Sequence, residues 1–169
     1  IYLSTVSFFL KDVFQVPTEY FGLAFAMTVI GFVIGSLLSS RLVMKWGQDK
    51  TLHRGTFVCL GANALVLFLT LYLPSSTVGF AILSILFFFG IGLISANASM
   101  GAVSLYPHKA GAASAVYGCV HSLSSATVGA IAGLLYAGRL LEPVALMLLC
   151  SVGALLGSAL IHRFRHHAA

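Results

Sequence analysis

Long uncharged stretches separated by short charged segments make up most of the chain. The uncharged stretches cover residues 20–40, 55–107, 110–138 and 144–161. A helix needs about 20 apolar residues to cross a hydrocarbon core of about 30 Å, so the second stretch is long enough for two crossings. Pro74 divides it, because proline disfavours helical geometry in the residue before it. The pattern therefore predicts an all-α chain of membrane-spanning helices.

The expected helices are five complete spans and one partial span. Their approximate ranges are 1–10 (partial), 20–43, 55–73, 78–105, 109–137 and 144–162, and residues 163–169 form a tail. Residues 1–10 are uncharged but cover only about half a crossing. Since the chain does not begin with Met, we interpret them as the end of a truncated helix and the chain as a fragment. We expect residues 1–169 to form one polytopic transmembrane helical bundle.

The composition excludes the main soluble classes. Of the 169 residues, 59% are hydrophobic and only 8% are charged, with a mean hydropathy of +1.02. A typical soluble domain has about 25% charged residues, so this chain has too few charges to cover a water-exposed surface. The dominance of apolar residues also excludes disorder, and three well-separated cysteines exclude a disulfide scaffold.

Basic residues are concentrated on one side of the predicted membrane. Seven of the nine Lys and Arg residues lie there, and they are Arg41, Lys45, Lys50, Arg54, Lys109, Arg163 and Arg165. Lys11 and Arg139 lie on the other side. By the positive-inside rule, the first set and the C-terminus are cytoplasmic. The net charge of +5 therefore reflects topology, and we expect contact with membrane lipid and no nucleic-acid partner.

Several segments carry a resemblance to a known family. Residues 35–50, from Gly35 through Arg41, Lys45 and Gly47, resemble the loop that joins the second and third helices of each half in the major facilitator superfamily. Residues 90–97 and 106–115 resemble the tenth and eleventh helices of the bicyclomycin and chloramphenicol resistance exporters, the Bcr/CflA branch. Residues 21–26 are similar to the start of the eighth helix of that branch.

The resemblance implies that this chain is the C-terminal six-helix half of a twelve-helix transporter. Such a transporter binds substrate between its two halves near the membrane midplane. The resemblance further implies efflux of small apolar or amphipathic compounds across the inner membrane. It implies that this efflux proceeds by alternating access and proton antiport, with the N-terminal half as partner. Ala96 and Ser7 stand where the branch commonly has proline. The branch keeps its embedded carboxylate in the N-terminal half, so proton coupling is not expected in these residues.

Two other functions fit a chain of this kind. An uptake porter or facilitator of the same fold would have a cavity rich in charged or hydroxyl groups matched to its solute. A membrane scaffold without transport activity is the second alternative. Enzyme activity is not expected, since no acid pair, nucleophile–base set or phosphate loop is present, and neither a cofactor nor a metal is expected.

His121 is the deepest ionisable side chain in the predicted spans. Tyr117, His121 and Ser125 are spaced by four residues and share one helix face. Ionisable groups in a membrane usually face a cavity or a partner. These residues are therefore candidates to bind substrate as a polar stripe. The alternative is a neutral histidine hydrogen-bonded to a neighbouring helix.

Other candidates depend on the family's helix order. Asn97 lies inside a span, where its amide either contacts substrate or joins two helices. Tyr2, Phe8 and Phe25 fall on helices that the family places beside the cavity, and the alternative for each is a lipid-facing or core aromatic. Gly35, Arg41, Lys45 and Gly47 correspond to a cytoplasmic gating loop, and the alternative role of the two basic residues is topology alone.

Small residues predict where the helices pack. Lipid gives helices no hydrophobic reason to associate, so small side chains that allow close backbone approach are favoured at contacts. The spacing Gly-xxx-Gly occurs at 31–35, 129–133 and 153–157. The span at 110–138 is the richest in small residues, and we expect it to lie inside the bundle.

Overall fold

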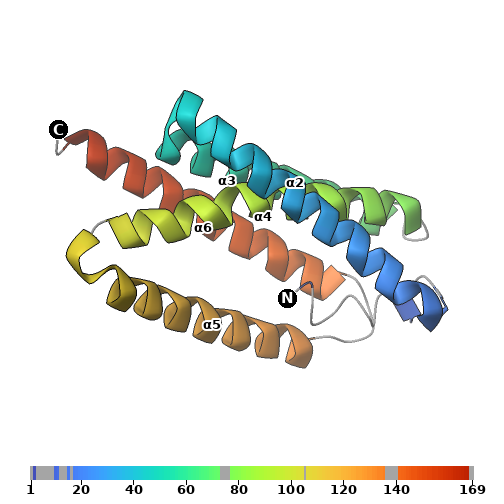
Figure 1. Ribbon diagram of the computed structural model, residues 1–169. Coiled ribbons are helices and arrows are strands. Elements are labelled where there is room, and N and C mark those ends of the chain that lie inside the picture. Colours follow the sequence, from blue (N-terminus) through green and yellow to red (C-terminus); the bar gives the residue numbers. More distant parts are fainter. Residues whose placement is uncertain are drawn as a thin grey trace.

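The computed structural model describes residues 2, 10–11, 15, 17–72, 77–104, 106–135 and 141–167. Its long helices are α2 (Phe21–Trp46), α3 (Gln48–Tyr72), α4 (Thr77–Ser104), α5 (Ala110–Leu135) and α6 (Leu141–His167). Two short 3₁₀ helices, η2 (Thr18–Tyr20) and η3 (Pro107–Lys109), precede α2 and α5. Figure 1 shows the long helices running back and forth along one direction. The predicted all-α class is confirmed.

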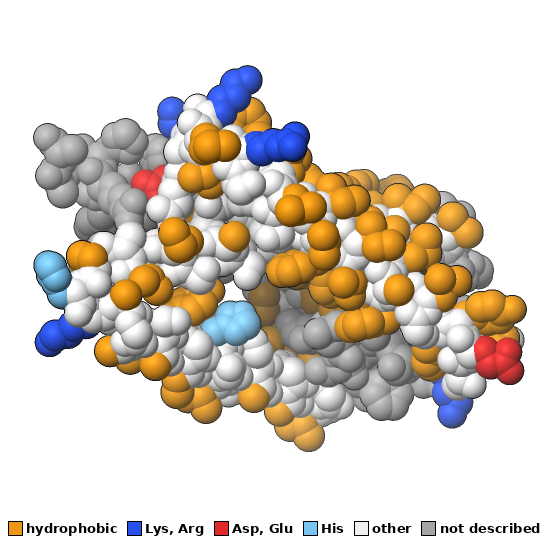
Figure 2. Space-filling model, viewed as in Figure 1, with side chains coloured by type: hydrophobic (Ala, Val, Ile, Leu, Met, Phe, Trp, Pro, Cys, Tyr) orange, Lys and Arg blue, Asp and Glu red, His pale blue; other side chains and the backbone are white. Residues whose placement is uncertain are grey.

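Within the described residues, five helices are long and apolar enough to cross a membrane. Many large apolar side chains are exposed on them, for example Leu37 on α2, Val78 on α4 and Leu134 on α5. In the space-filling view, apolar side chains cover the length of the molecule and charged side chains lie near its ends (Figure 2). A surface of this kind suits lipid rather than water. The chain is a multi-pass membrane protein.

The connection between α2 and α3 is much shorter than the sequence suggested. Gly47 has a φ of 81°, a conformation that favours glycine, and its N–H donates to the Val43 carbonyl at 2.9 Å. Thr51 Oγ1 then donates to the Gly47 carbonyl at 2.9 Å. The chain therefore starts α3 at Gln48, and the residues expected as a loop up to position 54 form the first turns of this helix.

Helices α2 and α4 pack with their backbones in close approach. A Cβ added at Gly31 would lie 2.5 Å from the Ile85 carbonyl oxygen, and one at Gly35 would collide with the Phe89 carbonyl. From the other side, a Cβ at Gly92 would collide with the backbone of α2. Such contact is possible only because these positions lack a side chain. The first of the three predicted Gly-xxx-Gly pairs thus lies at a helix contact.

Polar side chains join α3 to α6 along one seam. Near one end, His53 Nδ1 lies 2.9 Å from Ser158 Oγ. Farther along, Asn63 Nδ2 donates to Ser151 Oγ at 2.6 Å and to the Met147 carbonyl at 3.2 Å. Interhelical hydrogen bonds of this type stabilise membrane bundles by about 0.6 kcal/mol each on average. They fix the register of α3 against α6.

Helix α5 lies at the edge of the bundle (Figure 1). Ala132 is its buried residue, and Gly111, Gly118 and Gly133 have open space around them. The expectation that this span lies inside the bundle is wrong for the part of the chain that the structure describes. Small side chains contribute few contacts unless backbones approach closely, and α5 does not approach α4 or α6 as α2 approaches α4.

Candidate binding pocket

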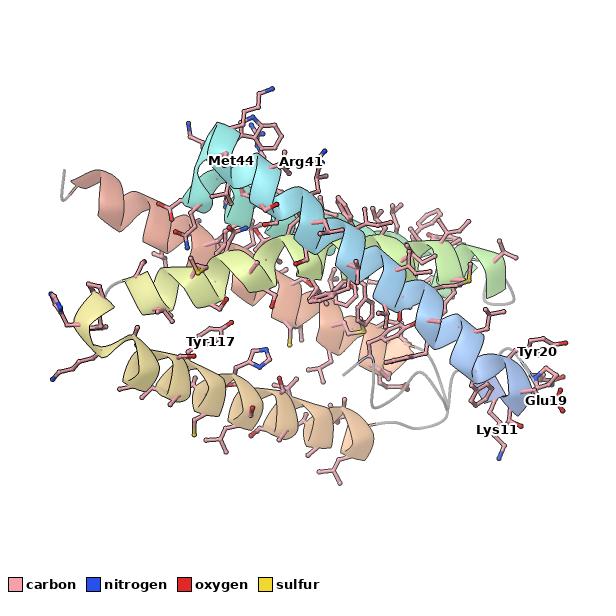
Figure 3. All side chains as sticks on the ribbon, in the orientation of Figure 1. Lys11, Glu19, Tyr20, Arg41, Met44 and Tyr117 are labelled. Atoms are coloured by element: carbon pink, nitrogen blue, oxygen red, sulfur yellow. The ribbon has the colours of Figure 1, made fainter. Side chains whose placement is uncertain are left out.

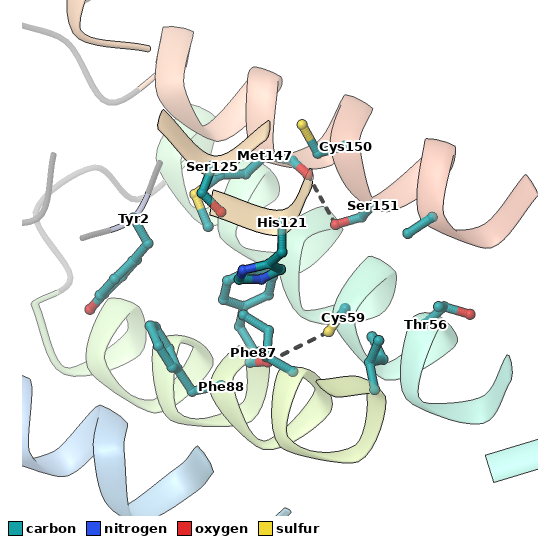
Figure 4. Close-up of a pocket in the computed structure, with 13 residues that line it drawn as sticks. Tyr2, Thr56, Cys59, Phe87, Phe88, His121, Ser125, Met147, Cys150 and Ser151 are labelled. Atoms are coloured by element: carbon teal, nitrogen blue, oxygen red, sulfur yellow. Dashed lines mark hydrogen bonds between the residues drawn. The ribbon is translucent and has the colours of Figure 1, made fainter. Parts of the chain in front are cut away.

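A pocket of about 500 Å³ lies between α5 on one side and α3, α4 and α6 on the other. Drug-sized ligands are generally bound in pockets of about 300–1,000 Å³. Side chains from four long helices and from Tyr2 surround it (Figure 4). The lining residues are Tyr2, Thr56, Cys59, Phe87, Phe88, Ile91, Ile94, His121, Ser125, Met147, Cys150, Ser151 and Ala154.

Aromatic rings form one wall of this pocket. The Tyr2 and Phe88 rings meet edge to face with centroids 5.0 Å apart, and Phe87 and Phe88 meet edge to face at 5.8 Å. Edge-to-face contact is a favourable geometry for aromatic pairs. Ile91 and Ile94, one and two turns farther along α4, line the pocket as well, so this helix presents a continuous apolar surface to a ligand.

Hydroxyl groups on the α3 and α6 walls have their hydrogens engaged within their own helices. Thr56 Oγ1 donates to the His53 carbonyl at 2.7 Å, and Ser151 Oγ donates to the Met147 carbonyl at 3.0 Å. A hydroxyl oxygen has further acceptor capacity. These two side chains can therefore accept hydrogen bonds from a ligand, although Ser151 already accepts one from Asn63.

His121 and Ser125 supply the polar groups of the α5 wall. Among the described residues, neither side chain has a hydrogen-bond partner, so both are available to a ligand. An imidazole accepts a hydrogen bond at one nitrogen and donates at the other when neutral, and donates at both when protonated. His121 is also the pocket's one side chain of Asp, Glu, Lys, Arg or His type among the lining residues described.

The predicted stripe on α5 faces two hollows rather than one. Tyr117 stacks near His121 with ring centroids 6.0 Å apart, and it projects from α5 in Figure 3. It does not line the pocket. Instead it borders a neighbouring groove of about 500 Å³ between α5 and the end of α4, together with Ala102, Tyr106 and Lys109.

Asn97 lies outside the pocket, at a helix contact. Its Nδ2 donates to Ser39 Oγ at 2.8 Å and to the Leu93 carbonyl at 2.6 Å. The backbone carbonyl of Asn97 accepts from Gln48 Nε2 at 2.6 Å. The amide nitrogen is therefore engaged between α2 and α4 in a residue only 4% exposed. Of the two roles considered for Asn97, these hydrogen bonds fit the joining of helices, and a substrate contact stays a prediction.

The two remaining aromatic candidates fall elsewhere. Phe25 lies on α2 with 45% of its surface exposed, on a helix whose other exposed side chains are also apolar. It is not part of the pocket lining and fits the lipid-facing alternative. Phe8 lies outside the described residues.

The predicted gating residues lie along the second half of α2. Gly35 is at the contact with α4, and Gly47 ends the helix. Arg41 and Lys45 are exposed, and Arg41 lies at the opposite end of the molecule from Lys11 and Glu19 (Figure 3). These positions are compatible with both alternatives, a role in gating and a role in membrane topology alone.

Sequence reasoning missed the contributions of α3 and α6 to the pocket. No residue of these two helices was among the predicted site residues, whereas Thr56 and Cys59 of α3 line this pocket with Met147 and Ser151 of α6. A signal was present in the spacing. Thr56 and Asn63 lie seven residues apart, as do Ser151 and Ser158, and the two sets pair in antiparallel order. Matched polar positions at this spacing indicate facing helices.

Two curated relatives match the chain. A bicyclomycin resistance protein homolog of Haemophilus influenzae is 31% identical over 153 residues, which cover 90% of this chain and 37% of the relative. A chloramphenicol resistance protein of Pseudomonas aeruginosa is 29% identical over 148 residues, covering 86% of this chain and 35% of the relative. No family model matches, and no solved structure matches.

The bundle of apolar helices around a pocket defines the class of the chain as a helical membrane protein. Within that class, it is a homologue of bacterial proteins named for resistance to bicyclomycin and chloramphenicol. The predicted resemblance to bicyclomycin and chloramphenicol resistance proteins is thus confirmed. The chain spans little more than a third of the length of these relatives.

Proposed function

We propose that the protein containing this chain exports small, largely apolar or amphipathic compounds and that the pocket beneath α5 contributes to its substrate cavity. The observation that carries the proposal is the composition of that pocket. An aromatic and aliphatic wall faces one histidine and a few hydroxyl groups, the pattern expected for a ligand held by shape and a few polar contacts. The names of the two relatives support drug resistance as the physiological outcome.

The pocket favours neutral or amphipathic substrates. Carboxylates are absent from the described lining residues, so this half of the cavity offers no ion pair to a permanent cation. His121 and Ser125 lie across from the aromatic wall and suit a compound with one polar edge and one apolar face. Aromatic rings adapt to different apolar shapes without a fixed hydrogen-bond geometry.

We infer that transport occurs by alternating access, coupled to inward proton flow, against an N-terminal half of the same transporter. The small-residue surface of α5 supports this partner, because an open surface of glycine and alanine is suited to close helix contact. In this assembly His121 would contact substrate, and the residues that carry protons would lie in the opposing half. The pump would reside in the inner membrane.

The proposed orientation puts the link between α2 and α3, the η3 turn and the C-terminal end of α6 in the cytoplasm. All three lie at the same end of the bundle (Figure 1). Arg41, Lys45 and Lys50 lie near this link and Lys109 at the η3 turn. The clustering of cations at one end supports the orientation by the positive-inside rule.

Growth and accumulation assays with the full-length gene test the proposal. Cells lacking their own drug exporters would express the gene and be challenged with neutral, anionic and cationic antibiotics, with and without a protonophore. The expected result is resistance and lower accumulation for neutral amphipathic drugs, both lost with the protonophore. Increased uptake of a solute would favour a porter, and no change in resistance, accumulation or uptake would favour a scaffold. Either outcome would overturn the exporter proposal.

A further inference from the structure

Asn63 has a buried polar atom that the polar seam does not satisfy. The residue is 1% exposed. Its Nδ2 uses both hydrogens, on Ser151 Oγ and on the Met147 carbonyl. Its Oδ1 is buried with no hydrogen-bond partner among the described residues. A buried polar atom without a partner costs about 1–3 kcal/mol. A ligand that donates a hydrogen bond to Oδ1 would therefore stabilise this region.

Asn63 also lines a small cavity. This cavity offers about 10 Å³ to the centre of a water-sized sphere and is separate from the large pocket. About this much space is needed to hold one water molecule. The cavity is lined by Tyr2, Asn63, Val66, Phe80, Ser84, Phe87, Val144 and Met147. Asn63, Tyr2 and Ser84 are its polar members.

We propose that this cavity binds a single water molecule, which donates one hydrogen to Asn63 Oδ1 and the other to a hydroxyl oxygen of Tyr2 or Ser84. Ser84 is 3% exposed and its hydroxyl hydrogen is engaged on the Phe80 carbonyl at 2.8 Å. Ser84 lines the cavity and is hydrogen-bonded to the Tyr2 side chain, and a hydroxyl oxygen has capacity to accept more than one hydrogen bond. Asn63 Oδ1 and a hydroxyl oxygen are two acceptors, which match the two hydrogens of water.

The chemistry of the lining selects water over other small ligands. The polar groups are neutral and the remaining residues are apolar, so a desolvated ion would lack a counter-charge. The volume is too small for an organic group. A methyl group in the same space would leave Oδ1 without a partner, whereas water satisfies it.

The water would join three parts of the chain next to the large pocket. Asn63 belongs to α3, Ser84 to α4, and Tyr2 precedes both. Tyr2, Phe87 and Met147 line both the cavity and the pocket. The water would thus hold the pocket's aromatic wall against the α3–α6 seam. This inference stands on the packing alone and does not depend on the proposed transport activity.

Radiolytic labelling of the full-length protein in ¹⁸O-enriched water tests the site. Hydroxyl radicals form at bound water and oxidise nearby side chains even where bulk solvent is excluded. Val66 and Val144 line the small cavity but not the large pocket, and Leu93, which is 4% exposed and lines neither, is the internal control. We expect Val144 to be oxidised several-fold faster than Leu93. Equal rates at Val66, Val144 and Leu93 would overturn the proposal.

Two variants connect the labelling to Asn63. Asn63→Leu removes the unsatisfied oxygen and should lower oxidation of Val144 to the rate of Leu93. Ser84→Ala combined with Tyr2→Phe removes both hydroxyl acceptors and leaves the α3–α6 seam intact, so it serves where Asn63→Leu does not fold. It should lower the Val144 rate as well. Unchanged Val144 oxidation in a folded variant of either kind would overturn the assignment of the water to these groups.

Discussion

Asn63 of α3 and Ser151 of α6 are joined by a hydrogen bond of 2.6 Å between two buried side chains. Thr56 and Ser158, one heptad away on the same two helices, approach to 3.4 Å. The two pairs run in antiparallel order and define one polar seam. Since Ser151 also lines the pocket, the seam positions the α6 side of the pocket relative to α3.

Breaking the seam at Asn63 should destabilise the bundle. Asn63→Ala removes two interhelical hydrogen bonds. Such bonds in membrane proteins contribute about 0.6 kcal/mol on average and at most about 1.7 kcal/mol. We expect a loss of about 1–3 kcal/mol, including the cavity that is left. Thermal or denaturant unfolding of the purified full-length protein measures it. In a cycle with Ser151→Ala, strictly additive losses would contradict direct coupling of the two side chains.

Adding one methyl group at Gly92 should disrupt the α2–α4 contact. A Cβ there would collide with the backbone of α2 around Phe32 and lie 2.8 Å from the Ser36 nitrogen. Backbone cannot move aside as a flexible side chain does, and overpacking of this type costs about 1–3 kcal/mol. Folded yield of a fluorescent fusion and its melting temperature measure the loss.

The matched control for Gly92→Ala is Gly61→Ala on α3. Gly61 has nothing within 4 Å of an added Cβ, and alanine is favoured over glycine in helices by about 1 kcal/mol. This variant should be as stable as the parent or slightly more stable. Similar destabilisation by both variants would show that the glycine effect is not specific to the helix contact.

His121→Ala should change transport without preventing membrane insertion. The imidazole lies in the pocket and has no hydrogen-bond partner among the described residues, so its loss leaves no protein group unpaired. We expect an altered drug range or an altered pH dependence of transport, read from resistance profiles and from transport in vesicles. Cys119→Ala, on an exposed position of the same helix outside the pocket, should keep the parent profile. A parent profile for both would make His121 a packing residue.

The fold was predictable from the sequence to the extent that hydropathy determines it. Uncharged stretches located the spans, and the pair Gly31 and Gly35 located a helix contact. The connection after α2 was not predictable from charge, since Lys50 and Arg54 suggested a loop. In the structure the break between the two helices is the single residue Gly47, whose carbonyl accepts a hydrogen bond from Thr51. In a lipid environment all faces of a helix are apolar, so hydrophobicity alone does not indicate which neighbour each face meets.

The lining of the candidate pocket was predictable from the sequence only in part. His121, Ser125 and Tyr2 lie in one pocket, as polar or aromatic residues expected near a cavity. Asn97 could not be placed, because an amide within a span serves equally well as a ligand contact or as a link between helices. The α3 and α6 residues were missed because their faces are identified by pairing across two helices, as with Asn63 and Ser151.

Chemical modification of the native cysteines in the full-length protein tests the pocket most directly. Cys150 lines the pocket, while Cys119 is exposed on α5 outside it. The two sites can be followed separately by mass spectrometry of maleimide-treated protein. With a saturating neutral drug that the growth assays identify as exported, we expect Cys150 to react several-fold more slowly and Cys119 to react at its original rate. Unchanged modification of Cys150 in the presence of a transported drug would contradict a substrate cavity beneath α5.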